Sequence, residues 1–149
     1  MKIRKMTALQ VLEHPDWPEL AREYGRENAH PEIGKGVFDP GFYLSLDIAG
    51  QLAISAAFDG ARLVGIVAVI FIFHPQYRKL IADLNGLWLH PSFRTGGAGL
   101  RLINEARRLA RKGGACGLQV TAPEGSRLER LYTRIAKPLD RVFWLSVKE

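Results

Sequence analysis

The sequence contains a single cysteine, Cys116, so no disulfide can form within the chain. Its longest apolar run, residues 63–73, is too short for a membrane span of about 20 residues. The first basic residues are not followed by the apolar segment of a signal peptide. We therefore expect a cytoplasmic protein without a membrane partner. Cys116 has no adjacent basic residue to activate it, so we expect a buried, inert thiol.

Metal ligands in a recognisable arrangement are also lacking. Each of the four histidines lies beside a proline, and no two have the spacing of ligands on one helix or strand. They are His14, His30, His74 and His90. We interpret all four as loop residues and expect no metal site.

Acidic residues are outnumbered by lysine and arginine, 15 against 21, which gives a formal net charge of +6. This balance favours anionic partners such as nucleic acid or a polyphosphate cofactor, although many small domains are simply basic. One predicted helix carries a basic stripe of Arg101, Arg107, Arg108, Arg111 and Lys112. No aromatic side chains for base stacking accompany the stripe, so we favour a solvated helix face over nucleic-acid binding.

The 149 residues fit one domain without internal repeats or linkers. Apolar alternation and turn residues predict strands at residues 1–6, 52–58, 63–73, 79–89, 118–121 and 142–147. Capping boxes predict helices that begin near residues 7 and 126, and capping residues predict helices that begin near residues 16 and 39, the first of which would stop at Gly25. An apolar face at helical spacing predicts a further helix from residue 99. This order predicts an α/β (α+β) fold over residues 1–149, with a mixed, mostly antiparallel central sheet and helices on both faces.

A glycine-rich loop separates the predicted strand 79–89 from the helix that follows it. Glycines let a ligand approach the backbone closely, and the first amides of a helix lie unpaired at the positive end of its dipole. The loop therefore predicts a pyrophosphate site, although it matches neither a Walker loop nor a Rossmann loop. Arg94 would add a positive charge. The loop residues are Arg94, Thr95, Gly96, Gly97, Ala98 and Gly99.

The pattern Arg-x-x-Gly-x-Gly in this loop resembles the acetyl-CoA loop of the GNAT superfamily of N-acyltransferases. The turn at residues 59–65 and the pair Leu131-Tyr132 are similar to the same family, so the resemblance covers roughly half of the chain. It implies a GNAT-like fold, acetyl-CoA (coenzyme A) as acyl donor, and a small-molecule or protein amine as acceptor. The stretch Leu-His-Pro-Ser-Phe-Arg at residues 89–94 also resembles phage-associated members of the family.

The resemblance implies that the backbone of three consecutive residues, Leu87, Trp88 and Leu89, binds the pantetheine arm of the cofactor. The Leu87 amide would polarise the thioester carbonyl as an oxyanion-hole donor does. Residues 94–99 would bind the pyrophosphate. We expect the Trp88 side chain to pack in the core.

Two side chains are candidates for proton transfer. Tyr132 matches the family tyrosine that protonates the departing thiolate, and a phenol with a pKa of about 10 can donate that proton. Its alternative role is that of a core aromatic residue. Asp83, an acid in an apolar strand, is the candidate general base. Alternatively, the Asp83 side chain faces solvent or forms an ion pair with Arg78 or Lys79.

The chain departs from the family pattern around the Leu-Tyr pair. Ser126 and Arg127 stand where members often have Asn-x-x-Ala, and residues 135–138 replace the usual Gly-Phe, which affects the sixth strand and one wall of the acceptor site. We predict an N-acetyltransferase in which the amine attacks acetyl-CoA directly in a ternary complex. A GNAT-fold structural or binding module, such as a virion-associated part, is the alternative, and a basic nucleic-acid-binding domain is the third reading. The sequence does not identify the acceptor amine. It is compatible with a homo-oligomer.

Overall fold

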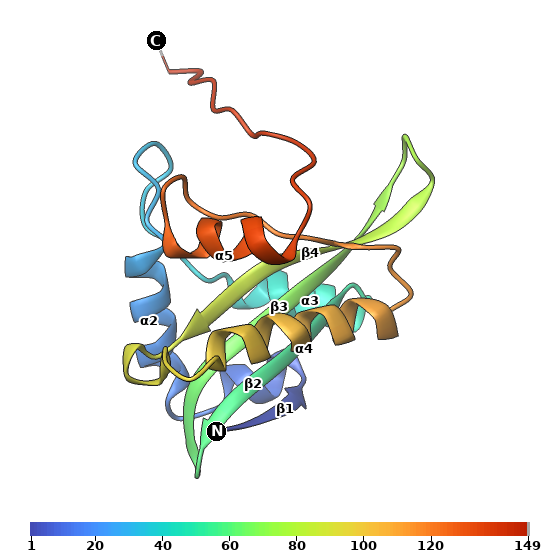
Figure 1. Cartoon of the computed structure of the whole chain (residues 1–149). Helices are drawn as coiled ribbons and strands as arrows, with labels where there is room; N and C mark the ends of the chain where they lie inside the picture. The colour runs from blue at the N-terminus through green and yellow to red at the C-terminus, as the bar shows by residue number, and fades with distance from the viewer. Residues whose placement is uncertain (149) are drawn as a thin grey trace.

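A five-stranded sheet in the order β1-β2-β3-β4-β5 forms the centre of the computed structural model, which describes residues 1–148 (Figure 1). Its strands are β1 (Lys2–Met6), β2 (Leu52–Asp59), β3 (Arg62–His74), β4 (Lys79–Leu89) and β5 (Leu118–Gln119). The first four pair antiparallel with their neighbours, and β5 pairs parallel to β4. The predicted mixed, mostly antiparallel sheet is therefore confirmed.

Local capping signals place most of the helices. The helices are α1 (Ala8–Leu12), α2 (Trp17–Glu27), α3 (Pro40–Ile48), the short 3-10 helix η1 (Pro91–Phe93), α4 (Ala98–Lys112) and α5 (Arg127–Ile135). Thr7 forms the predicted capping box of α1, and Asp39 caps α3 ahead of a proline. Gly25 does not end α2 as predicted. It lies inside the helix, where a Cβ would come within 2.2 Å of the Gly36 carbonyl oxygen, so its role is close backbone approach.

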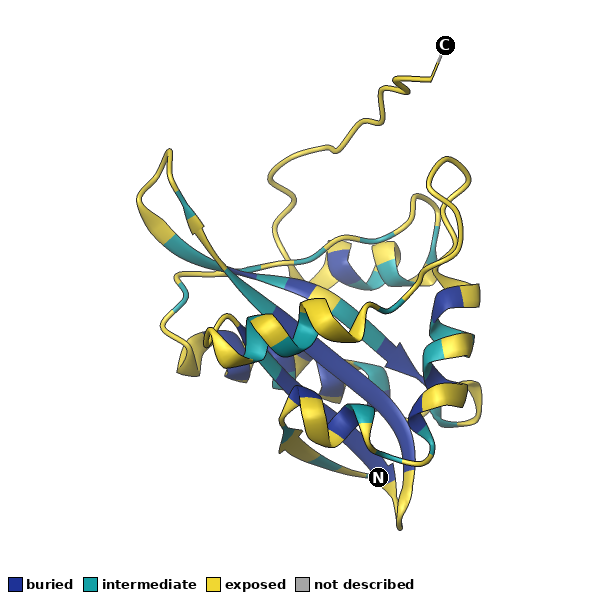
Figure 2. Cartoon of the chain, turned by 180° about the vertical axis from the view of Figure 1, so that it is seen from behind, coloured by how far each residue is buried: buried dark blue, intermediate teal, exposed yellow. Residues whose placement is uncertain are grey.

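The core has two layers because β3 is apolar on both faces. Val67 and Val69 pack in one cluster with α4, whereas Ile66, Ala68 and Trp88 pack in a second cluster with α1 and α2. Figure 2 shows the buried residues running along the central strands between these layers. Helices therefore cover both faces of the sheet, as predicted, and the Trp88 side chain is buried in the core. No helix within residues 1–148 is both long and apolar enough to cross a membrane.

Two expectations near the end of the chain are wrong. Residues 142–147 form no strand, because a strand needs a neighbour to bond with and this segment runs away from the sheet, exposed to solvent (Figures 1 and 2). Cys116 is exposed rather than buried, because it lies in the loop that precedes β5.

Candidate active site

Strand β4 contains a β-bulge at Asn85. Ala68 and Val69 are adjacent on β3, but they pair with Gly86 and Leu84, so Asn85 is an extra residue on β4. An extra residue shifts the alternation of the strand, and such bulges are common next to active sites. The bulge therefore changes which backbone groups of β4 face each neighbouring strand.

Backbone hydrogen bonds on either side of the bulge show this change. The Ala82 N–H donates to the Gly117 carbonyl on the β5 side, at 3.0 Å, whereas the His90 N–H donates to the Val64 carbonyl on the β3 side, at 2.7 Å. In a regular strand, the N–H groups of two residues an even number of positions apart point toward the same neighbouring strand, and Ala82 and His90 are eight positions apart. Counting back from His90, the Leu87 N–H faces the β5 side. This is the direction that the proposed role of the Leu87 amide requires.

The β5 side of β4 is paired over only a short stretch. Among the described residues, β5 pairs with β4 at two positions, Ala82 with Leu118 and Asp83 with Gln119. The chain then leaves the sheet toward α5 (Figure 1). The edge of β4 at residues 84–89 therefore has no strand paired to it on this side, and the Leu87 backbone and the Leu89 N–H on it are available to a ligand.

The N-terminus of α4 lies directly after this edge. Gly97 is the N-cap and offers no side-chain acceptor to the helix. The Ala98 N–H donates to the Thr95 carbonyl at 3.1 Å, but the N–H groups of Gly99 and Leu100 belong to the first turn and have no intrahelical acceptor. These two donors lie at the positive end of the α4 dipole, a position that favours binding of an anion.

Open space surrounds the glycines of the loop. No heavy atom lies within 4 Å of a Cβ built on Gly96, Gly97 or Gly99. Gly96 and Gly97 also have φ angles of 57° and 76°, which side-chain-bearing residues rarely adopt. The residues present therefore fit a bound pyrophosphate, because the loop combines free donors with room for close approach.

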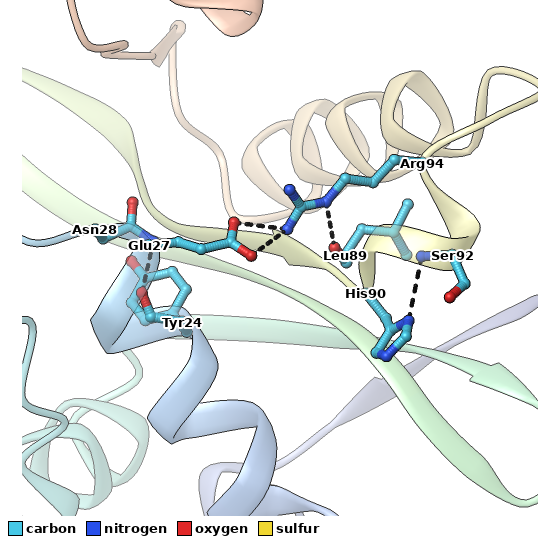
Figure 3. Close-up of polar contacts among 7 residues, drawn as sticks. All are labelled: Tyr24, Glu27, Asn28, Leu89, His90, Ser92 and Arg94. Atoms are coloured by element: carbon cyan, nitrogen blue, oxygen red, sulfur yellow. Dashed lines mark hydrogen bonds and ion pairs between the residues drawn. The ribbon is translucent and has the colours of Figure 1, made fainter.

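Arg94 lies in this loop, but its side chain is already paired (Figure 3). Its Nη2 donates to both carboxylate oxygens of Glu27 at the end of α2, at 2.6 and 2.8 Å, and its Nε donates to the Leu89 carbonyl at 2.7 Å. The guanidinium also lies 5.8 Å from the Trp88 ring centroid. In this arrangement Arg94 links the loop to α2. The positive charge that Arg94 was expected to add to the pyrophosphate site is paired with the Glu27 carboxylate.

Tyr132 comes from α5, whose N-terminus is capped by the Ser126 side chain. The Glu129 carboxylate accepts from the Gly125 N–H, so the predicted capping box closes on the residue before the cap. Tyr132 is buried in the cluster that also contains Leu84 and residues of α4. Burial raises its pKa to about 12, so the phenol keeps its proton at neutral pH. The side chain therefore holds a proton at neutral pH, although burial makes it a weaker acid than a free phenol.

Asp83 lies on β4 before the bulge and is half-buried. Its neighbours Ala82 and Leu84 pack in the cluster of Tyr132, so strand alternation puts Asp83 on the opposite face, toward α2 and α3. Burial raises the pKa of this carboxyl. The ion pairs of the described residues do not include Asp83, so the alternative in which Asp83 pairs with Arg78 or Lys79 is not observed.

Two tyrosines that the sequence analysis did not single out bind the bulge. The Tyr24 hydroxyl donates to the Asn85 carbonyl at 3.3 Å, and the Tyr43 hydroxyl donates to Asn85 Oδ1 at 2.6 Å. Burial raises the pKa of both phenols. The tyrosines come from α2 and α3, which are far from Asn85 in sequence, so no local pattern could have revealed them.

Residues 8–136 match the acetyltransferase (GNAT) family. The chain belongs to this family. The matched region runs from α1 to the end of α5 and includes the bulged strand, the glycine loop and Tyr132. The family resemblance is thus confirmed. No curated protein matches the chain.

Solved structures with the same fold are numerous. A ribosomal-protein-alanine N-acetyltransferase from Brucella melitensis biovar Abortus 2308 has a TM-score of 0.70 at 17% identity, with 98% of this chain and 99% of that chain covered. An aminoglycoside N-acetyltransferase in complex with CoA has a TM-score of 0.70 at 20% identity, with 99% of both chains covered. An aminoglycoside acetyltransferase from an uncultured soil metagenomic sample has a TM-score of 0.72 at 17% identity, covering 99% and 96%. These likenesses establish the GNAT fold for this chain.

Proposed function

We propose that this GNAT protein is an acetyl-CoA-dependent N-acetyltransferase that acts on a primary amine by direct attack within a ternary complex. The observation that carries the proposal is the unpaired, bulged edge of β4 beside the open N-terminus of α4. A ligand with an amide-containing arm and a pyrophosphate needs both features at once. A purely structural module would need neither.

Backbone groups bind the donor in this proposal. Acetyl-CoA supplies a thioester whose carbonyl carbon bonds to the amine nitrogen while the C–S bond breaks. The Leu87 N–H donates to the carbonyl oxygen, on which negative charge develops. The Leu89 N–H, which faces the unpaired edge, pairs with the pantetheine arm, whereas the neighbouring Trp88 backbone faces β3. The free N–H groups of Gly99 and Leu100 bind the pyrophosphate beside the open backbone of Gly96 and Gly97, with Thr95 and Arg94 at its edge.

Two side chains handle the protons. Asp83 accepts the proton that the amine nitrogen loses on forming the new bond, because its raised pKa brings it closer to a useful value for a base. Tyr132 donates a proton to the departing sulfur, and its raised pKa of about 12 keeps the phenol protonated while making it a weaker acid than a free phenol. Asp83 and Tyr132 lie on opposite faces of β4. In this proposal the amine therefore loses its proton on one face of the strand, and the thiolate receives a proton from the other face.

The acceptor is proposed as a primary amine of a small molecule or of a protein. The named neighbours include enzymes of both kinds, acting on aminoglycosides and on a ribosomal protein. The face of β4 that carries Asp83 is also the face that Tyr24 and Tyr43 reach. An amine that approaches from α2 and α3 would therefore meet the proposed base first.

The proposal is tested by thermal unfolding with and without acetyl-CoA, followed by release of free thiol with a panel of amines. Acetyl-CoA should raise the melting temperature, because a ligand that binds only the native state stabilises it. At least one amine should then accelerate thiol release above the rate of hydrolysis. A stable protein that acetyl-CoA does not shift would overturn the proposal, and a shift without turnover on any amine would favour the binding module.

A further inference from the structure

Asn85, the extra residue of the bulge, is exposed, and both of its oxygen atoms are hydrogen-bonded. Its backbone carbonyl accepts from the Tyr24 hydroxyl at 3.3 Å, and its Oδ1 accepts from the Tyr43 hydroxyl at 2.6 Å. The hydrogen bonds of the described residues do not include its Nδ2. The group that the side chain leaves free is therefore a donor, the two N–H bonds of a primary amide.

The tyrosines also fix the direction of this donor. An unrestrained asparagine can turn its side chain and exchange the places of its oxygen and nitrogen, but the short bond from Tyr43 holds Oδ1 of Asn85 toward α3. Tyr43 is itself held by stacking on Phe38, with ring centroids 4.0 Å apart. A ligand that binds the Asn85 amide therefore does not have to immobilise it first, which favours binding.

Asp83 lies two positions before Asn85 on the same face of β4. It pairs in register with Ile70, which packs in the cluster that contains residues of α2 and α3, and Asn85 is bound from those two helices. Residues two positions apart in a strand are separated by at most about 7 Å. A carboxylate and an amide donor are therefore neighbours on the face that the acceptor amine would reach.

We propose that the Asn85 amide binds an oxygen of the acceptor, and that the preferred acceptor is a primary amine with a hydrogen-bond-accepting oxygen on the neighbouring carbon atom. This inference rests on the proposed function, in which Asp83 takes the proton of the reacting nitrogen. A hydrogen bond at each end takes up about 2.9 Å of the space between Asp83 and Asn85, so the nitrogen and the oxygen of the substrate must be close together.

Two kinds of amine share this chemistry, those with an ether or hydroxyl oxygen and those with a carbonyl oxygen on the neighbouring carbon. A plain alkylamine would desolvate the Asn85 amide without giving it a partner, which costs free energy. The preference is thus set by the unpaired donor and not by the charge of the amine.

Asn85→Asp tests this assignment with little change of shape. The carboxylate still offers an acceptor to the Tyr43 hydroxyl, so the hold on the bulge is retained, but the Nδ2 donor is lost. Asn104→Asp is the matched control, because Asn104 is exposed on α4, on the other face of the sheet, and the change of charge is the same. Tyr43→Phe keeps the amide but removes the bond that directs it.

The value of kcat/KM with acetyl-CoA is compared for 2-methoxyethylamine, glycine dimethylamide and butylamine, in which a methylene replaces the ether oxygen of the first. The ratio of either oxygen-bearing amine to butylamine should fall about 3- to 10-fold in Asn85→Asp, as the loss of one hydrogen bond predicts. It should fall by a smaller factor in Tyr43→Phe and stay unchanged in Asn104→Asp. The basicities of the amines and the added charge cancel in this ratio.

Two further comparisons complete the kinetic test. Whichever of 2-methoxyethylamine and glycine dimethylamide loses more in Asn85→Asp identifies an ether or a carbonyl as the preferred oxygen. 4-Methoxybutylamine, whose oxygen lies too far from its nitrogen, should behave as butylamine does. A ratio that is the same in the wild type and in Asn85→Asp for both oxygen-bearing amines overturns the inference.

A second readout does not depend on turnover. In isotope-labelled protein with coenzyme A bound, the side-chain NH2 signals of Asn85 are identified in the NMR spectrum by their loss in Asn85→Asp. They should shift when 2-methoxyethylamine is added and stay in place with butylamine. Absence of reaction with every amine contradicts the proposed function, whereas the selective shift would still support the role of Asn85. Equal shifts with both amines, or none with either, overturn the inference even where turnover is found.

Discussion

Substitution of Gly99 separates ligand binding from folding more cleanly than any other change in the glycine loop. Gly99 is the second residue of α4, its backbone is helical, and nothing lies within 4 Å of a Cβ built on it. Alanine in place of a helical glycine stabilises by about 0.5–1 kcal/mol. A domain of this size gains roughly 2–4 °C per kcal/mol, so Gly99→Ala should raise the melting temperature of the free protein by about 1–4 °C. Gly97 lacks this advantage, because its φ of 76° makes any side chain strained.

Acetyl-CoA should reverse the order of the two proteins. At a concentration of about 100 times its Kd, a ligand stabilises the native state by about 2.7 kcal/mol, which corresponds to roughly 5–10 °C for the wild type. A side chain at position 99 occupies the space that the pyrophosphate needs. Gly99→Leu should therefore lose nearly all of the shift at the same concentration, and Gly99→Ala should lose part of it.

Gly41 provides the control, because it is the second residue of α3 and faces no predicted ligand. Gly41→Leu should leave the acetyl-CoA shift at its wild-type size. Thermal unfolding and titration calorimetry would measure both effects. A folded Gly99→Leu protein that keeps the full shift would refute the assignment of the pyrophosphate to the α4 N-terminus.

The remaining predictions concern side chains around the same site. Tyr132→Phe should lower kcat about 100-fold or more while the Kd for acetyl-CoA stays unchanged, and a wild-type rate at every pH would exclude Tyr132 as the acid. Because the raised pKa of Asp83 keeps it protonated to higher pH, the wild-type rate should climb as pH rises through that pKa. Asp83→Asn should abolish this limb, and its persistence would assign the base elsewhere. Glu27→Gln releases Arg94 from an exposed ion pair worth at most about 1 kcal/mol, so stability should hardly change while the Kd for coenzyme A falls. Arg94→Ala should weaken coenzyme A more than acetyl-pantetheine, which has no pyrophosphate, and an equal loss for both would confine Arg94 to a structural role.

Features that depend on a few neighbouring residues were predictable from the sequence. The capping box at Thr7, the cap at Asp39 and the glycine turn between β2 and β3 each depend on side chains or glycines within one turn of the chain. The loop at residues 94–99 belongs to the same class, because its open backbone follows from the glycines themselves. These local features were sufficient to predict the order of most helices and strands along the chain and the position of the glycine loop.

Features that depend on distant partners were not predictable in this way. The segment 142–147 has strand composition, but composition does not specify an edge to pair with. The charge of Arg94 was evident, whereas its pairing with Glu27 depends on how α2 packs across the sheet. Cys116 was expected to be a buried, inert thiol because it has no adjacent basic residue, yet the loop that contains it stays on the surface.

In the proposed mechanism, the bulge at Asn85 lets one strand contact both substrates. Asp83 precedes it and faces α2 and α3, whereas Leu87 follows it and turns its N–H to the unpaired edge. Without the extra residue, the alternation would point the Leu87 N–H toward β3, where it would form a hydrogen bond within the sheet. Because Tyr24 and Tyr43 bind Asn85 from α2 and α3, the helices on the acceptor side also fix the position of the bulge. The geometry of the donor amide is therefore set by the same helices that an approaching amine would contact.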